Sequence, residues 1–143
     1  MKYRKAEKAD LDQVVRVAST AFEDYLFLKV IKDLVRDPKQ YPAFVEAMMR
    51  ILVKVFLKHH ICLVAEKNDE IYAVALLQKG PIPFRAYLLN GGFGLLKFIS
   101  LKNMLSYFKF MEDTDKELEE NVDFDWYLML LAVAPKHQRQ GYG

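Results

Sequence analysis

The sequence predicts one domain of the α/β or α+β class, with a mixed, mostly antiparallel sheet flanked by helices. Runs rich in β-branched and other apolar residues alternate with segments in which apolar residues recur every three or four positions. The order is strand, helix, helix, strand, strand, helical insertion, strand and polar turn, which is typical of helices packed on a sheet. The 143 residues, 52% hydrophobic and 28% charged, suffice for one globular domain.

The chain begins with a short expected edge strand, KYRKA at residues 2–6, followed at once by a helix. Asp10 with Gln13 three residues later predicts a capping box at the start of that helix. Its buried face is expected to consist of apolar residues at three-and-four spacing: Leu11, Val14, Val15, Ala18, Ala21 and Phe22. The loop that follows, residues 23–37, is expected to be partly helical.

A second helix is the clearest element of the sequence. Asp37 is placed to cap it and Pro38 suits the first turn. Its apolar stripe comprises Tyr41, Phe44, Val45, Met48, Met49, Leu52, Val55 and Phe56. The helix is predicted to end near His59. His59 and His60 are adjacent, which is not the spacing of two metal ligands on one helix face, so we interpret them as a polar helix terminus.

Residues 61–67 and 71–80 are predicted to form an antiparallel hairpin, joined by the polar turn at residues 68–70. Pro81 and Pro83 end the second strand, because proline cannot donate to a ladder. Cys62 is the one cysteine, so no internal disulfide is possible, and it is expected to be a buried thiol without chemistry.

The apolar and aromatic segment at residues 91–111 predicts one or two helices that cover the core. The alternatives are a lid or wall over a substrate pocket and a membrane-surface helix, the latter disfavoured by few and scattered lysines. The next apolar run, FDWYLMLLAV at residues 124–133, has almost no polar side chain besides Asp125. It predicts a strand covered on both faces, at the centre of the sheet.

Charge is unevenly distributed along the chain. Residues 1–110 hold 18 of the 21 Lys and Arg and 11 of the 19 acids, whereas residues 111–143 hold 3 and 8. The acidic segment, residues 112–125, is either a solvated acidic helix or loop or a negative rim that attracts a cationic amine. A net charge of +2 gives no reason to expect nucleic acid. No leader peptide or run of roughly 20 apolar residues is visible, so we expect a cytoplasmic protein without a membrane partner.

The final segment, AVAPKHQRQGYG at residues 132–143, predicts an anion site. A strand that ends in a glycine-containing turn before a helix presents backbone N–H groups without carbonyl partners, and the helix dipole adds positive charge there. Gly141 and Gly143 permit positive φ and close approach, while Lys136 and Arg139 add charge. The pattern is neither a P-loop nor a dinucleotide fingerprint.

Residues 138–143, Gln-Arg-Gln-Gly-Tyr-Gly, resemble the acetyl-CoA motif of the GNAT superfamily of N-acetyltransferases: Gln or Arg, two residues, Gly, one residue, Gly or Ala. Val133, Pro135 and Gln138 are also in the family's register, and DWYLMLLAV is similar to the small-molecule branch that includes puromycin N-acetyltransferase. The order of elements is similar over nearly the whole chain. The resemblance implies a transferase that moves an acetyl group from acetyl-CoA to a primary amine of a small molecule by direct attack.

The resemblance also implies a cofactor site. The diphosphate is expected on the backbone N–H groups of the turn, and pantetheine beside the strand like an added strand. The implied cofactor-binding residues are Leu131, Ala132, Val133, Gln138, Arg139, Gln140, Gly141, Tyr142 and Gly143. A backbone N–H of the strand is expected to stabilise the oxyanion. His137 is either a CoA contact or a solvated loop residue.

Acetyl transfer needs a base that removes a proton from the ammonium group. By the resemblance, Asp125 and Asp123 are the candidates and Glu120 a weaker one, although each is equally explained as an exposed carboxylate before a strand. Trp126 and Tyr127 are neighbours expected to point to opposite faces of the strand. Either is a candidate wall of the amine pocket, with core packing as the alternative.

In the family the motif opens a helix, with further strands and a tyrosine that protonates the CoA thiolate after it. We therefore expect residues 1–143 to be the amino-terminal part of a single GNAT-like domain, truncated within the motif and inactive alone. A bare strand edge favours a homodimer. Two alternatives remain: a noncatalytic CoA-binding or interaction module, or an accidental match with a polar tail. No metal is expected.

Overall fold

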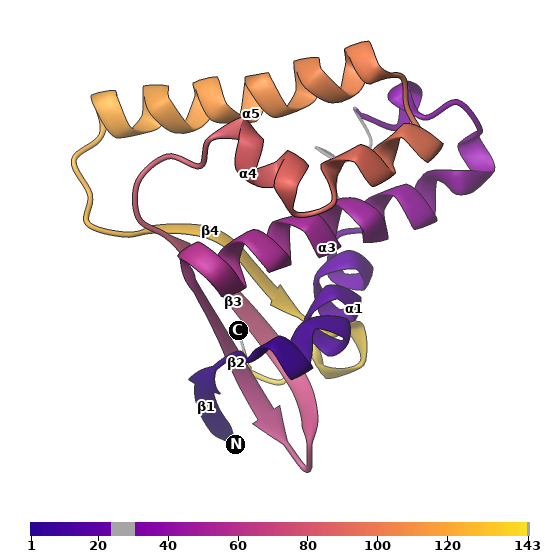
Figure 1. The fold of residues 1–143 in the computed structure, drawn as a ribbon. Coiled ribbons are helices and arrows are strands. Elements are labelled where there is room, and N and C mark those ends of the chain that lie inside the picture. Colours follow the sequence, from indigo (N-terminus) through magenta and orange to yellow (C-terminus); the bar gives the residue numbers. More distant parts are fainter. Residues whose placement is uncertain (24–30, 143) are drawn as a thin grey trace.

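The computed structural model describes residues 1–23 and 31–142. It has an α+β fold with a four-stranded antiparallel sheet in the order β1-β2-β3-β4 (Figure 1). The strands are β1 (Lys2–Lys5), β2 (Ile61–Lys67), β3 (Glu70–Gln78) and β4 (Tyr127–Val133). The predicted α+β class is confirmed. All pairs in this sheet are antiparallel, so the described residues contain no parallel pair of the kind a mixed sheet would have.

The predicted central position of the last strand is wrong. β4 pairs with β3 alone and forms one edge of the described sheet. Leu128 and Leu131 are nearly half exposed, at 47% and 46%, while Leu130 and Ala132 are buried. An unbroken apolar run is typical of a strand buried on both faces, but here only one face packs under helices. β4 also begins at Tyr127 rather than at Phe124.

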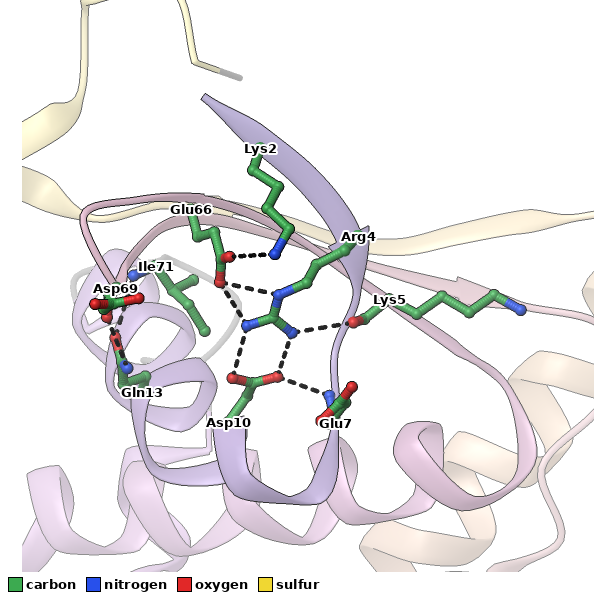
Figure 2. A network of polar contacts seen from close by, with 9 residues as sticks. All are labelled: Lys2, Arg4, Lys5, Glu7, Asp10, Gln13, Glu66, Asp69 and Ile71. Atoms are coloured by element: carbon green, nitrogen blue, oxygen red, sulfur yellow. Dashed lines mark hydrogen bonds and ion pairs between the residues drawn. The ribbon is translucent and has the colours of Figure 1, made fainter.

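α1 (Leu11–Phe22) begins where the sequence predicted, but Asp10 does not cap it with Gln13. Asp10 instead accepts the Glu7 N–H at 2.7 Å and two hydrogen bonds from the Arg4 guanidinium at 2.7 and 3.0 Å. Gln13 accepts the Ile71 N–H at 3.1 Å, so it joins α1 to the hairpin (Figure 2). The Arg4 guanidinium binds the Asp10 carboxylate in place of the helix N–H groups. The local capping pattern does not reveal this competition.

Arg4 also donates to Glu66 of β2 from Nε at 2.9 Å, so one guanidinium joins β1, β2 and the start of α1 (Figure 2). The Arg4 side chain holds the pKa of Asp10 and of Glu66 below their usual values, mainly through these hydrogen bonds. The same contacts raise the pKa of Arg4. The expected edge strand at the amino terminus is confirmed, and this network fixes its position.

α3 (Tyr41–His59) matches the prediction closely. Asp37 accepts the Lys39 N–H at 3.0 Å, and the short 3₁₀ helix Pro38–Gln40 leads into α3. Residues of the predicted stripe such as Phe44, Val45 and Phe56 are almost fully buried. Of the preceding loop, residues 24–30 lie outside the described residues, and Lys32–Leu34 is a 3₁₀ helix.

The predicted hairpin is confirmed as β2 and β3. Asn68 and Asp69 both have positive φ, 54° and 59°, which is the conformation of a two-residue type I′ turn. β4 pairs with β3 in turn. Cys62 is buried as expected, and burial raises the pKa of its thiol to about 12.

The helical insertion comprises α4 (Phe84–Leu89), the 3₁₀ helix η4 (Gly92–Lys97) and α5 (Leu101–Asn121). Ser100 caps α5 by accepting the Asn103 N–H at 3.2 Å. α1 and α3 pack on the sheet, α4 and η4 pack on α3, and α5 packs on α4 and η4 (Figure 1). The core-covering prediction is confirmed by buried Met104 and Phe108. α4 was not predicted, and most of the acidic segment forms the second half of α5.

Within residues 1–23 and 31–142, no helix has both the length and the apolar character needed to cross a membrane.

Candidate cofactor site

One edge of β4 is unpaired in the described structure. Ala134 N–H donates to Tyr72 O at 2.8 Å, and Ala132 lies opposite Val74 of β3. In an antiparallel pair the two backbone groups of alternate residues face the partner strand, so Ala132 faces β3. Leu131 and Val133 therefore direct their N–H and C=O groups to the open edge. Of the three strand residues expected to bind pantetheine, two have the backbone direction that this requires.

The motif glutamine folds back on this edge. Gln138 Nε2 donates to the Val133 carbonyl at 3.1 Å. The open backbone groups are then the N–H and C=O of Leu131 and the N–H of Val133. These two residues alternate with a residue turned toward β3, which is the spacing that an added strand or an extended amide-containing ligand matches.

The turn after β4 contains backbone N–H groups without acceptors among the described residues. The 3₁₀ helix η5 (Pro135–His137) is followed by two residues of positive φ, Arg139 at 63° and Gly141 at 81°. The backbone N–H groups of residues 139–142 donate to no acceptor in the described part of the chain. Gln138 is extended, with φ −64° and ψ 156°, so Gln138 and Arg139 together resemble the centre of a type II turn. Gly143 lies outside the described residues.

Side chains of the hairpin hold the turn. The His137 ring stacks on Tyr72, with ring centroids 3.6 Å apart, and its Nε2 lies 3.5 Å from Glu70 Oε1. Lys136 also pairs with Glu70, and this contact holds the pKa of Glu70 below its usual value. Lys136 was expected to be a mobile charge near the anion. The structure pairs it instead, whereas the exposed Arg139 side chain has no ion pair among the described residues.

A β-bulge at Met129 was not predicted. Leu76 lies opposite Leu130 and Leu77 opposite Leu128, so Met129 is an extra residue on β4. An extra residue in a bulge loses its ladder partner, and bulges are frequent next to active sites. The sequence around Met129 contains no glycine that would have marked it.

The candidate bases precede β4 in the chain. Asp123 and Asp125 are exposed residues of the connection between α5 and β4, and Glu120 is exposed near the end of α5. Trp126 precedes β4 and is 46% exposed, with Lys79 Nζ 5.7 Å from its ring centroid. Tyr127 is the first residue of β4 and, unlike Trp126, lines an apolar cavity next to α5.

Asp115 is a carboxylate that does not stand out in the sequence. It lies on α5 within the acidic segment and lines the same cavity as Tyr127. Burial raises its pKa above the usual value, the opposite of the shift in Asp10. Asp115 comes four residues after Met111 and three before Leu118, and both of these residues also line the cavity. Because i, i+3 and i+4 positions share a helix face, this spacing is the sequence signal that could have identified Asp115.

His60, a remaining titratable residue, has a structural role at the end of α3. His60 accepts the Lys79 N–H at 3.4 Å and packs against Phe56, as a polar helix terminus would. Burial lowers the pKa of His60. In the described ranges no three His, Cys, Asp or Glu side chains are placed to hold a metal ion.

No protein-family model matches the chain, and no curated protein matches its sequence.

Proposed function

We propose that the chain binds acetyl-CoA along the open edge of β4 and the following turn, as the cofactor-binding part of an N-acetyltransferase acting on a small-molecule primary amine. One observation supports this most: the unpaired edge at Leu131 and Val133 leads directly into a turn whose N–H groups at residues 139–142 lack acceptors. A cofactor that consists of an extended amide chain followed by a diphosphate needs these two kinds of binding group in the same order.

The directions of the backbone groups determine where each part of the cofactor is expected to bind. The pantetheine amides pair with Leu131 and Val133, while Ala132 contributes its buried side chain and its pairing with β3. The diphosphate accepts from the N–H groups of residues 139–142, where Gly141 allows close approach. Arg139 adds the positive charge, because Lys136 is already paired with Glu70.

The reaction takes place near the bulge. We place the thioester carbonyl beside the backbone of Met129, the extra residue of the bulge. The amine, after losing a proton, bonds to the carbonyl carbon. The C–S bond then breaks, the sulfur keeps the electron pair and takes up a proton, and the amide nitrogen loses one. A positioned N–H at the developing oxyanion is worth about 3 kcal/mol.

The resemblance places the donor of the thiolate proton after the motif. Binding, not turnover, is the property of this chain that tests the proposal.

Isothermal titration of the chain with acetyl-CoA is the direct experiment. Leu131→Pro removes an outward-facing N–H, a place where an edge strand tolerates proline. We expect this variant to bind acetyl-CoA about tenfold more weakly, the loss of one hydrogen bond of roughly 1.4 kcal/mol. Wild-type chain that gives no binding heat at millimolar acetyl-CoA contradicts the proposal.

Tyr3→Pro is the matched control. Ala6 N–H donates to Cys62 O, so by alternation Tyr3 faces away from β2 on the other edge of the sheet. We expect Tyr3→Pro to bind acetyl-CoA as the wild type does. Equal weakening by the two prolines would show that the effect comes from the sheet as a whole and would exclude the β4 edge as the binding site.

A further inference from the structure

A cavity of about 320 Å³ lies between α3, α5 and the start of β4. Its walls are mainly methionine, leucine and aromatic side chains from these elements, with Tyr87 of α4 and Phe22 of α1 completing them. The volume is at the lower end of the roughly 300–1,000 Å³ range of small-molecule sites. A ligand of this cavity must therefore be small and have a largely apolar body.

Polar groups in the wall come from Tyr87, Tyr107, Thr114, Asp115 and Tyr127, and those of Tyr87 and Asp115 are the candidate ligand contacts. Tyr87 is 1% exposed, and its hydroxyl has no hydrogen-bond partner in the described part of the chain. Its ring is held flat against Phe108, with centroids 5.1 Å apart. A buried hydroxyl without a partner costs about 1–3 kcal/mol, so a ligand that bonds to it recovers free energy.

Asp115 is the second candidate contact. Its carboxylate is partly buried and accepts the Ile82 N–H at 3.4 Å. No lysine or arginine of residues 1–23 or 31–142 forms an ion pair with it. The nearest lysine on α5, Lys116, pairs with Glu112 instead. Tyr87 and Asp115 line the same cavity, and the charge of Asp115 raises the pKa of the Tyr87 hydroxyl, after the larger effect of burial.

The charge of the wall selects the ligand. A carboxylate in apolar surroundings favours a cation and disfavours an anion. A protonated amine supplies the cation and also N–H donors for hydroxyl and carboxylate oxygens. We infer that the cavity binds a small apolar primary amine, with its ammonium group between Asp115 and Tyr87 and its apolar body between α3 and α5.

This inference rests on the proposed function in one respect: it makes the bound amine the acetyl acceptor. Met129 and Tyr127 line the cavity, and Met129 is also the bulge residue beside which the thioester carbonyl is placed. The cavity and the cofactor edge therefore meet on β4. The acceptor class becomes apolar monoamines, which excludes polyamines because a second charge would lie against methionine and leucine side chains.

The test measures amine binding without CoA. The probes are 2-phenylethylamine, its neutral isostere 2-phenylethanol and the anion 3-phenylpropanoate, titrated into the 143-residue chain by calorimetry at pH 7. We expect the amine to bind about tenfold more tightly than the alcohol, and the anion not to bind. Absence of amine binding at millimolar concentration, or equal affinity for the three probes, overturns the inference.

Variants separate the two polar groups. Asp115→Asn is expected to weaken binding of the amine about tenfold and to leave binding of the alcohol unchanged. Tyr87→Phe keeps the ring stacked on Phe108 and is expected to weaken binding of both the amine and the alcohol. Asp113→Asn removes the same charge from an exposed position of the same helix and is the matched control, with no expected change. Equal effects of the Asp115 and Asp113 variants would reduce the role of Asp115 to long-range attraction and overturn the pairing.

The two proposals fail separately. Amine binding without acetyl-CoA binding removes the acceptor role and leaves the cavity as an amine site. Acetyl-CoA binding without amine binding removes the amine site and leaves the proposed cofactor function.

Discussion

The imidazole ring of His137 lies flat on the phenol ring of Tyr72, with centroids 3.6 Å apart and planes 7° from parallel. Tyr72 is also the extra residue of a bulge between β2 and β3, since Ala65 lies opposite Ala73 and Glu66 opposite Ile71. A bulge re-aims a side chain, and here the residue at the bulge contacts the turn after β4. Its carbonyl also accepts the Ala134 N–H. One residue of the hairpin thus fixes both the end of β4 and the turn.

Removal of this stack is expected to loosen the turn. His137→Ala should lower the free energy of unfolding by about 1 kcal/mol, the usual contribution of a stacked pair, and weaken acetyl-CoA binding. His59→Ala is the control, because His59 is exposed at the end of α3. Chemical denaturation and calorimetry of both variants check this. An unchanged affinity for acetyl-CoA in folded His137→Ala would show that the stack does not position the cofactor turn.

Gly141 is expected to be the most sensitive glycine of the turn. A Cβ there meets no atom within 4 Å, but φ is +81°, so Gly141→Ala is strained by backbone conformation alone. We expect a cost of about 1 kcal/mol and weaker binding of acetyl-CoA. Gly94→Ala also meets open space and has no positive φ, so it should be neutral or slightly stabilising. Equal thermal stability and affinity of the two variants would contradict the left-handed conformation of Gly141.

Gly92 tests the packing of the helical insertion. A Cβ at this position would lie 2.9 Å from the Tyr87 carbonyl oxygen and 3.0 Å from Phe108 Cε2. Gly92→Ala should therefore lower the free energy of unfolding by about 2 kcal/mol, in the range for overpacked sites. It should also weaken 2-phenylethylamine binding, because Tyr87 and Phe108 both line the cavity. A melting temperature equal to that of Gly94→Ala would contradict this close approach.

The Arg4 network predicts a dependence of stability on pH. Asp10 and Glu66 have folded-state pKa values below their unfolded values, about 3.9 and 4.3, so the folded state binds fewer protons there. Their contribution is present above about pH 4.3 and is lost as pH falls through the folded-state values. Arg4→Met removes the partner and should lower the melting temperature at pH 7.

The difference in melting temperature between wild type and Arg4→Met should shrink as pH falls below about 4. Arg50→Met is the control, because Arg50 pairs with the exposed Asp12, for which the effect is expected to be small. A difference for Arg4→Met that stays constant from pH 7 to pH 3 would show that the network does not contribute through these carboxylates.

The sequence predicted most of the fold where one signal was dominant. The stripe of α3 and the hairpin were correct, because periodic burial and a short polar turn determine them locally. Asp10 was assigned to Gln13 because capping patterns are local, whereas its actual partner Arg4 depends on the position of β1 beside β2. β4 was placed at the centre because an apolar run does not show which of its edges is paired.

The turn of the candidate site could be predicted from the sequence, but the cavity could not. Gly141 and the glutamine of the motif stand out in a sequence, and the structure gives the turn a positive φ at Gly141. Whether it binds a cofactor remains a prediction. Asp115 was hidden among eight acids of residues 111–143, because burial of one carboxylate depends on how α5 packs on α4 and η4 and faces the cavity. The bulge at Met129 depends on pairing with β3 and has no mark in the sequence.

The most direct measurement is an amide-resolved NMR titration of the chain with CoA, followed by hydrogen exchange of the complex. The account predicts that the amides of Leu131, Val133 and residues 139–142 shift on binding, and that those of Leu131 and Val133 become protected from exchange. The Ala132 amide should be protected already in the free chain, because it faces β3. CoA-induced shifts confined to other residues, or Leu131 and Val133 amides that are protected before CoA is added, would contradict an open cofactor edge on β4.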